Sequence, residues 1–365
     1  MTGRKRARDW GFPLPGTTGP LNAITDVAGV EVGMVTLIEG EGPLRRGAGP
    51  VRTGVTAILP RGRAKGGLPV FAGLFSLNGA GEMTGAHWIE ESGLLEGPLA
   101  ITNTHSVGAV HEGILRWGLE SGQARVMEWG LPLVAETFDG ELNDIDGFHV
   151  RPGHAVEALE AASGGPVPLG SVGGGTGMIC YGYKGGSGSA SRRVRVAGTD
   201  YTLGVFVQAN FGMREELTLC GLPVGRELDN ADELRAQPAG SIIAVVATDA
   251  PLLPQQLKRL ARRVPLGMAR SGAVGHNGSG DIFLAFSTAN EAAAKSRSGA
   301  AALEALANAE MDLLFEATVE ATDEAILDCL FCNRDMKGRD GNFVPALPDA
   351  VIEDVLRRLA ARDGK

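Results

Sequence analysis

The chain has 365 residues, a formal net charge of −9 and 54 glycines, while aromatic residues make up only 5% of it. A chain of this length can bury a sizeable core without disulfides. Its acidic balance disfavours nucleic acid as a partner, and no stretch approaches the ~18 apolar residues that a membrane helix requires. The composition therefore indicates a globular protein that contacts neither nucleic acid nor membrane.

The chain opens with a basic stretch, Arg4-Lys-Arg-Ala-Arg8. We expect this stretch to be a solvated tail. No apolar segment follows it, as a secretory signal peptide would require, so the expected compartment is the cytoplasm.

Short apolar runs predict strands in chain order over 55–60, 69–77, 99–102, 131–138, 201–209, 241–248 and 281–287. Continuous apolar runs of this length are typical of strands that are covered on both faces. Residues 194–197 and 201–209 flank Gly198-Thr-Asp200, which predicts a hairpin.

Apolar residues at helical spacing predict helices over 254–264, 291–306, 310–331 and 349–361, the second of them capped by Asn290. The chain shows no internal repeat, no low-complexity linker and no break in composition. We therefore expect a single α/β domain over residues 1–365, with sheets held between helix layers.

The four cysteines are too few for a disulfide framework. Cys329 and Cys332 form a C-x-x-C pair in an apolar helical run, without a second pair or a histidine at zinc spacing. We expect this pair to pack in the core. The six histidines also lack the spacing of a metal site, so the sequence predicts no metal and no cofactor.

The densest glycine segment, residues 170–188, has some features of a phosphate-binding loop. Its order is neither G-x-x-x-x-G-K-[ST] nor a G-x-G-x-x-G that opens a helix after a strand. We expect instead a tight loop that lets the backbone approach a substrate or a neighbouring subunit.

Gly240-Ser241 places a small hydroxyl at the start of a strongly apolar predicted strand. Glycine has no side chain to obstruct the reaction, so Ser241 Oγ could attack the Gly240 carbonyl and free a new N-terminal serine. The α-amino group of that serine, with an ordinary pKa of about 7.7–8.0, could then act as a general base. The chain holds five Gly-Ser pairs, so an ordinary turn is the alternative.

Polar side chains stand at the ends of three other predicted strands. Ser279 and Asp281 are two residues apart and would point the same way, where they could orient a nucleophile. The Asn210 amide could donate to an oxyanion, and Glu136 could hold a substrate amine. Turn formation is the alternative for these residues.

The chain contains no G-x-S-x-G and no H-E-x-x-H, which disfavours an α/β-hydrolase and a zinc peptidase.

Together these segments resemble the L-aminopeptidase/D-esterase–amidase family, which includes the β-aminopeptidases. The match runs nearly end to end and rests on residues 19–33, 81–85, 173–178, 207–210, 240–241 and 278–281. The resemblance implies a four-layer αββα sandwich that is similar to N-terminal nucleophile hydrolases but has an altered strand connectivity.

The resemblance also implies self-cleavage into an α chain, residues 1–240, and a β chain, residues 241–365, assembled as a homotetramer of αβ units. Ser241 matches the family's nucleophile, Asn210 its oxyanion residue, and Ser279 with Asp281 the groups that support the nucleophile. Glu136 matches the carboxylate that holds the substrate amine. The implied activity is removal of an N-terminal residue from small peptides, amides or esters through an acyl-enzyme.

Phe138 departs from the family pattern, which usually carries a tyrosine at this position in the active site. If the tyrosine hydroxyl stabilises an oxyanion, its loss could cost about 3 kcal/mol. One alternative function is therefore an uncleaved or weakly active non-peptidase relative. The other is acyl transfer as in the ornithine acetyltransferases, which have a related fold but usually a threonine nucleophile.

Overall fold

The structure, a computed structural model, describes residues 4–122, 130–229, 233–234 and 240–363. Two large sheets dominate it. The four-stranded sheet has the order β1 (Glu31–Glu39), β2 (Val51–Leu59), β5 (Leu99–Asn103), β6 (Leu133–Thr137). The six-stranded sheet has the order β4 (Leu94–Glu96), β3 (Pro69–Gly79), β12 (Ser279–Ser287), β11 (Gly240–Thr248), β10 (Thr199–Asn210), β9 (Gly186–Val196).

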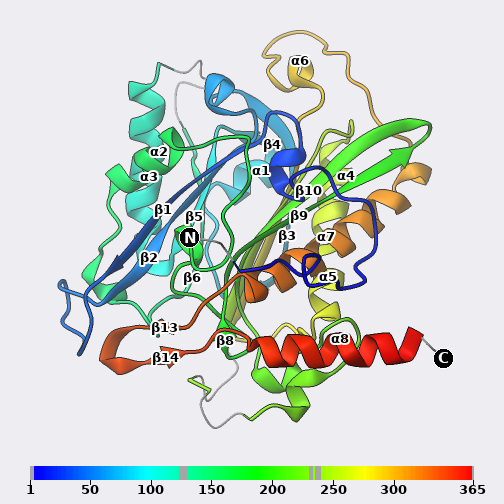
Figure 1. Cartoon of the computed structure of the whole chain (residues 1–365). Helices are drawn as coiled ribbons and strands as arrows, with labels where there is room; N and C mark the ends of the chain where they lie inside the picture. Colours follow the sequence, from blue (N-terminus) through cyan, green and yellow to red (C-terminus); the bar gives the residue numbers. More distant parts are fainter. Residues whose placement is uncertain (1–3, 123–129, 230–232, 235–239, 364–365) are drawn as a thin grey trace.

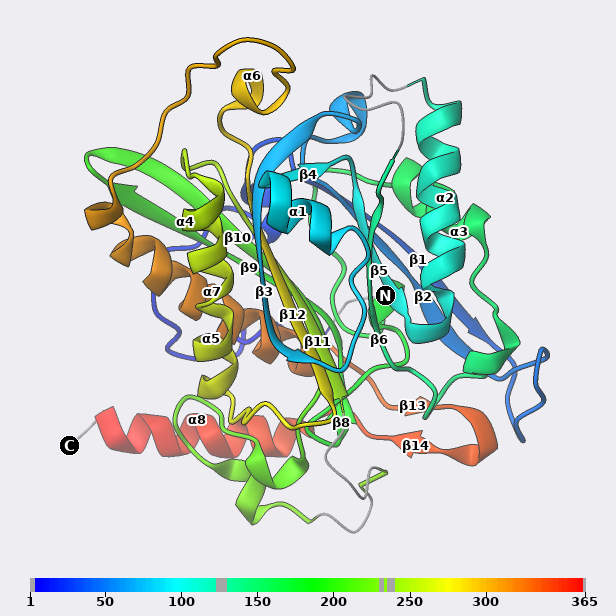
Figure 2. The same ribbon diagram turned by 180° about the vertical axis from the view of Figure 1, so that it is seen from behind.

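Helices cover the outer face of each sheet (Figures 1 and 2). The four-stranded sheet carries α2 (Val107–Glu120) and α3 (Pro152–Glu160). The six-stranded sheet carries α4 (Pro254–Ala261) and α7 (Asp312–Phe331), and α5 (Val264–Arg270) packs on α7. The described residues also form a C-terminal helix, α8 (Asp349–Asp363), and the short elements α1 (Ala86–Ser92), α6 (Glu291–Ala294), β7 (Ile179–Cys180), β8 (Tyr183–Lys184), β13 (Met336–Lys337) and β14 (Phe343–Val344).

Apolar side chains fill the three spaces between these four layers. The inner faces of the two sheets meet in one cluster, in which Ile58 and Ile101 of one sheet pack with Ile243 and Phe286 of the other. Separate clusters lie under α2 and α3 and under α4, α5 and α7. The expected αββα sandwich is therefore confirmed.

Each of the seven strands predicted from an apolar run is present. The strand predicted over 241–248 is β11, whose residues 241–248 are all buried because both of its faces are covered. The predicted hairpin is β9 and β10, which pair antiparallel from Val196 opposite Thr199 onward.

The glycine-rich segment folds as a tight loop between the sheets. The backbone N–H of Gly173 donates to Thr36 Oγ1 at 2.8 Å, and that of Gly174 donates to Thr56 Oγ1 at 3.1 Å. Both acceptors lie in the four-stranded sheet, so this backbone packs closely against the protein's own strands.

Two of the helix predictions are wrong in extent. The segment predicted over 291–306 is helical only in α6, because the alanines beyond it face solvent and have no apolar surface to pack against. Asn290 occupies the N-cap position of α6, as predicted, but its side chain bonds to the backbone of Glu304 and makes no capping hydrogen bond. The helix predicted over 254–264 ends at Ala261, and a second helix, α5, starts just before Pro265.

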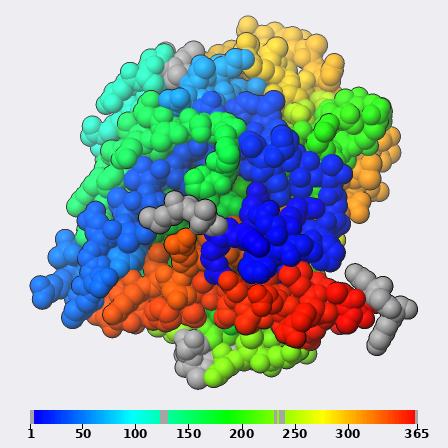
Figure 3. Space-filling view, viewed as in Figure 1, coloured from blue at the N-terminus to red at the C-terminus, as the bar shows by residue number. Residues whose placement is uncertain are grey.

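The prediction of a solvated N-terminal tail is also wrong. Arg6 pairs with the buried Asp328 at 2.7 Å, and Arg8 pairs with the buried Glu324 at 2.8 Å. Both carboxylates belong to α7. Figure 3 shows this dark-blue segment lying against the orange and red C-terminal part of the chain. The basic residues therefore fasten the start of the chain to a core helix.

The four cysteines are free thiols. Cys329 is buried in the cluster around α7, as predicted, and burial raises the pKa of its thiol. Cys332 is half-buried, and burial raises the pKa of its thiol to about 12. Among the helices of the described ranges, none combines the length and the hydropathy of a membrane span.

Removing the Glu324 carboxylate should destabilise the protein. Glu324 accepts bonds from Arg8, Arg192 and Asn22, and Arg192 is only 1% exposed. Glu324→Ala would leave the buried guanidinium with one carboxylate, Glu320 at 3.1 Å, and the carbonyl oxygen of Ser191. We therefore expect a loss of about 3 kcal/mol in the free energy of unfolding by denaturant. Asp200→Ala, which breaks the exposed pair with Arg195, is the control and should have almost no effect. Equal losses in the two variants would contradict this account.

Candidate active site

The central strands of the six-stranded sheet bring the predicted residues together. β10 pairs antiparallel with β11, which sets Asn210 opposite Ser241. β11 pairs parallel with β12, which sets Ser241 opposite Gly280, between Ser279 and Asp281. Four residues from three adjacent strands therefore lie at one end of the sheet, and each is less than 5% exposed. By strand alternation Ser241 and Asn210 face the other sheet, while Ser279 and Asp281 lie on the opposite face of the same strands.

The Ser241 hydroxyl lies against the peptide bond that precedes it. Its Oγ donates to the Gly240 carbonyl oxygen at 2.6 Å. A Cβ on Gly240 would lie 2.4 Å from the Asn210 carbonyl oxygen and 2.7 Å from Phe211 Cα. Only glycine fits here, because both of the atoms that it would meet belong to the backbone.

Ser279 and Asp281 are hydrogen-bonded to each other. Ser279 Oγ donates to Asp281 Oδ1 at 2.6 Å, as expected for residues two apart at the start of a strand. Burial raises the pKa of the Asp281 carboxyl, while bonds from Ser279, Asn78 and the Ile242 N–H oppose that rise. A hollow lined in part by Phe211, Val274 and His276 reaches this pair from outside.

Asn210 is fully buried and is held from two sides. Its Oδ1 accepts the backbone N–H of Ile179 at 2.9 Å, and its Nδ2 donates to the carbonyl oxygen of Phe138 at 2.9 Å. These two bonds fix the plane of the amide. They also tie the end of β10 to the segment that follows β6.

Glu136 comes from the other sheet, near the end of β6. Its carboxylate is 3% exposed and accepts the backbone N–H of Glu82 at 2.9 Å and the hydroxyl of Thr104. Burial raises the pKa of Glu136, whereas these two bonds and the nearby His105 lower it. The result is a buried carboxylate suited to holding a positive charge.

Gly81 connects the two halves of the site. A Cβ on it would lie 3.1 Å from Gly280 Cα and 3.3 Å from Glu136 Oε1. The segment after β3 therefore passes between the Glu136 carboxylate and the start of β12. This close approach brings residues from both sheets into one site.

Phe138 stands directly after β6 with its side chain 41% exposed. Its ring folds over Gly140, where a Cβ would lie 2.3 Å from the ring. Phe138 contributes its carbonyl oxygen to the site, as the acceptor for Asn210, and it has no hydroxyl to offer.

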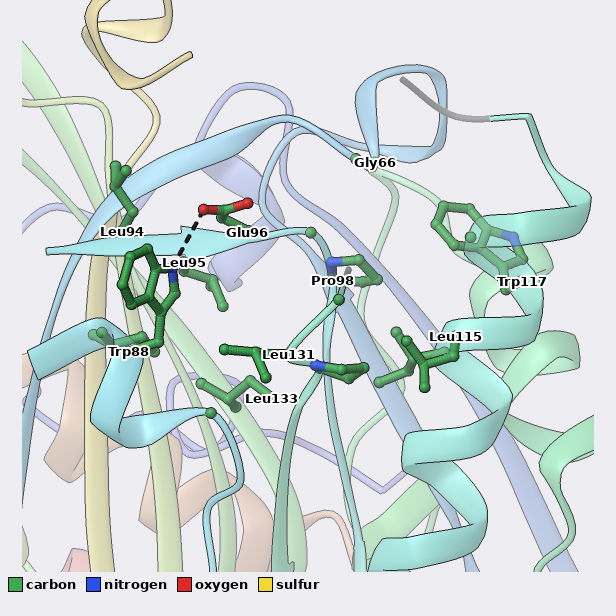
Figure 4. A pocket seen from close by; sticks show the side chains of 18 residues that line it. Gly66, Trp88, Leu94, Leu95, Glu96, Pro98, Leu115, Trp117, Leu131 and Leu133 are labelled. Carbon is green, nitrogen blue, oxygen red and sulfur yellow. Dashed lines mark hydrogen bonds between the residues drawn. The ribbon is translucent and has the colours of Figure 1, made fainter. Parts of the chain in front are cut away.

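A second, largely apolar hollow lies elsewhere. It is lined by α1, β4, α2 and the start of β6 (Figure 4). Trp88 and Trp117 face it, and its carboxylate, Glu96, accepts the indole N–H of Trp88 at 3.3 Å. None of the predicted site residues lines it. In the described ranges, no group of three or more His, Cys, Asp or Glu side chains could hold a metal ion.

Sequence reasoning missed three contributors to the site. Asn78 donates to Asp281, the Thr104 hydroxyl donates to Glu136, and the Glu82 backbone supports the same carboxylate. These contacts join residues that are 32 to 203 positions apart. Asn78 and Thr104 stand next to predicted strand ends, and Glu82 lies in the segment 81–85 that carries the resemblance, but neither signal indicates these contacts.

Comparison with known proteins agrees with the resemblance found in the sequence. The family model described as "Peptidase family S58" matches residues 22–344. The chain is 52% identical to the β-peptidyl aminopeptidase BapA of Sphingosinicella microcystinivorans, over 98% of this chain and 93% of that protein. It is 42% identical to BapA of Sphingosinicella xenopeptidilytica, over 96% and 91%.

Solved structures give the same result. The L-aminopeptidase D-Ala-esterase/amidase of Ochrobactrum anthropi, described as a new variant of the Ntn hydrolase fold, superposes with a TM-score of 0.90 at 44% identity, over 97% of this chain and 99% of that one. A Burkholderia sp. β-aminopeptidase gives a TM-score of 0.87 at 45% identity, over 97% and 99%. The fold is therefore this variant of the N-terminal nucleophile hydrolase fold, and the chain belongs to peptidase family S58.

Proposed function

We propose that this protein is a serine aminopeptidase that activates itself by cutting the Gly240–Ser241 bond. The observation that carries the proposal is the Ser241 hydroxyl, 2.6 Å from the Gly240 carbonyl oxygen and flanked by Asn210 and the Ser279–Asp281 pair. A nucleophile, an amide donor and an acid–base pair in one buried site are what acyl transfer requires.

In the proposed self-cleavage, Ser241 Oγ attacks the Gly240 carbonyl carbon. The C–N bond between the two residues breaks, and the Gly240 carbonyl is left as an ester on Ser241 while the α-amino group of Ser241 takes up a proton. Water then hydrolyses the ester. The products are residues 1–240 and a chain that begins with Ser241, whose α-amino group is close enough to its own hydroxyl to act as its base.

In the proposed turnover, Ser241 Oγ attacks the carbonyl carbon of the substrate. Its proton passes to the α-amino group, which Ser279 and Asp281 support. The rigidly held Asn210 amide stabilises the negative charge that develops on the carbonyl oxygen. The α-amino group then protonates the leaving amine, and water hydrolyses the acyl-enzyme.

The buried Glu136 carboxylate supports a preference for substrates with a free amino group. A carboxylate that is 3% exposed binds an ammonium group strongly, because water competes little for it. We therefore propose an exopeptidase that acts on small peptides, amides or esters. The names of the two BapA relatives favour β-peptides as members of this substrate class.

The alternatives remain as outcomes of the tests below. Phe138 is the observation that favours a weakly active or uncleaved relative, because its ring offers no hydrogen bond at the site. Acyl transfer to an amine would yield an amide product instead of an acid.

The proposal includes a homotetramer of αβ units, which light scattering would test. It also includes action in the cytoplasm, with which four free thiols agree.

Replacing the nucleophile should abolish both reactions. We expect Ser241→Ala to remain a single 365-residue chain by intact mass and to lose turnover of amino-acid amides, because no other group on β11 replaces the hydroxyl. The wild type should give two species, 1–240 and 241–365. Ser171→Ala, which also follows a glycine, is the matched control and should be cut normally. A processed and active Ser241→Ala protein would falsify the assignment.

Neutralising Glu136 should weaken substrate binding more than catalysis. Glu136→Gln keeps the shape but loses the charge, so KM for a substrate with a free amine should rise about 10- to 100-fold. In the wild type, KM should rise as the pH falls through the raised pKa of Glu136, because the protonated acid no longer attracts ammonium. Glu82→Gln, which keeps the backbone donor, is the control. Equal KM values for Glu136→Gln and wild type would remove Glu136 from substrate binding.

Restoring the family hydroxyl should increase the rate. If Phe138 weakens the oxyanion site, Phe138→Tyr should raise kcat by up to about 100-fold. Phe138→Leu, which adds no hydrogen-bonding group, serves as the control. A tyrosine variant no faster than the wild type would show that the hydroxyl is not needed in this protein.

A further inference from the structure

A β-bulge in β3 lies directly beside the candidate site. β3 and β12 pair antiparallel, with Asp281 opposite Asn78 and Ile282 opposite Ser76, so Leu77 has no partner. The Leu77 side chain is 41% exposed. Bulges bend a strand locally and redirect a side chain, and they are frequent next to active sites. Because of the extra residue in β3, Asn78 lies directly opposite Asp281 in the pairing of the two strands.

The Asn78 amide donates two hydrogen bonds at this position. Its Nδ2 lies 2.9 Å from Asp281 Oδ2 and 3.2 Å from the carbonyl oxygen of His276. Asp281 Oδ1 accepts the Ser279 hydroxyl at 2.6 Å. Each carboxylate oxygen therefore has its own donor, one from β12 and one from β3.

We infer that Asn78 is a positioning residue for catalysis, which holds Asp281 ionised and oriented so that the Ser279 hydroxyl must donate to it. With its proton directed at Asp281, the Ser279 oxygen presents its lone pairs to a donor on the other side. In the proposed function, on which this inference rests, that donor is the α-amino group of Ser241. Asn78 thus acts through Asp281 and Ser279 without touching substrate.

The surroundings of Asp281 make this contact consequential. Burial disfavours the charged carboxylate, and the groups that oppose burial are the Ser279 hydroxyl, the Asn78 amide, the Ile242 N–H of β11 and His276. His276 is itself paired with Glu216 at 2.6 Å. Losing Asn78 would remove one of few groups that keep the carboxylate ionised, so the pKa of Asp281 would rise further.

A purely structural role makes a different prediction. If Asn78 only ties the loop before β12 through the His276 carbonyl, its loss would lower stability, but the pH dependence of the rate would keep its shape. The pH profile therefore separates the two roles.

The test compares Asn78→Ala and Asn78→Asp with wild type, and uses Leu77→Ala as the control on the same bulge. kcat and KM for an amino-acid amide are measured across pH. We expect the acidic limb of kcat to move to higher pH in Asn78→Ala, with about tenfold lower kcat on that limb and unchanged KM. In Asn78→Asp the limb should move further, because two adjacent carboxyls cannot both ionise. Leu77→Ala should keep the wild-type profile.

An acidic limb that stays in place in both Asn78 variants would overturn the inference while leaving the proposed function standing. A second readout needs no activity. The ¹³Cγ shift of Asp281 in aspartate-labelled protein, assigned with Asp281→Asn, reports its titration directly. If wild type proves inactive, the proposed function fails, and this titration still decides whether Asn78 lowers the pKa of Asp281.

Discussion

The site depends on how closely β10 and β11 approach each other at Gly240. The place of a Cβ on this residue is taken by the backbone of Asn210 and Phe211. Any side chain would push β11 away from β10 and break the pairing that sets Ser241 opposite Asn210. A shift of a single residue in this register would turn Ser241 to the other face of the sheet. The glycine whose carbonyl would be attacked in the proposed cleavage therefore also sets Ser241 opposite Asn210.

Polar contacts between the sheets keep the two parts of the site aligned. Gln208 Nε2 donates to Thr137 Oγ1 at 2.7 Å and to the Thr102 carbonyl oxygen at 3.2 Å, and Asn210 reaches the Phe138 carbonyl. Apolar packing between sheets is not directional, whereas these buried hydrogen bonds fix one relative position. Two of the acceptors, Thr137 and Phe138, directly follow Glu136 in the chain. The Glu136 carboxylate of one sheet therefore stays in place relative to Ser241 of the other.

Local patterns predicted the strands well, because buried strands need continuous apolar runs whatever surrounds them. Local patterns gave wrong predictions where tertiary contacts determine the conformation of a segment. Residues 291–306 have helical composition but no surface to pack on, and the basic residues Arg6 and Arg8 find carboxylates more than 300 positions away. In the site, Ser241, Asn210, Ser279, Asp281 and Glu136 were all named from the sequence, and the structure brings them together. Asn78 could not be found, since its contact with Asp281 arises from a bulge between distant strands.

The position of Gly240 within the sheet determines what self-cleavage would leave behind. A cut there would put β10 in one product and β11 in the other, still paired along their length. Val205 and Val207 of the first product share a core with Val246 and Leu327 of the second. Ion pairs also join the two products: three arginines of the first pair with three carboxylates of α7 in the second, namely Arg6 with Asp328, Arg8 with Glu324, and Arg192 with Glu320 and Glu324. The products would form a non-covalent heterodimer with one common interior, so separating them and unfolding them would be the same event.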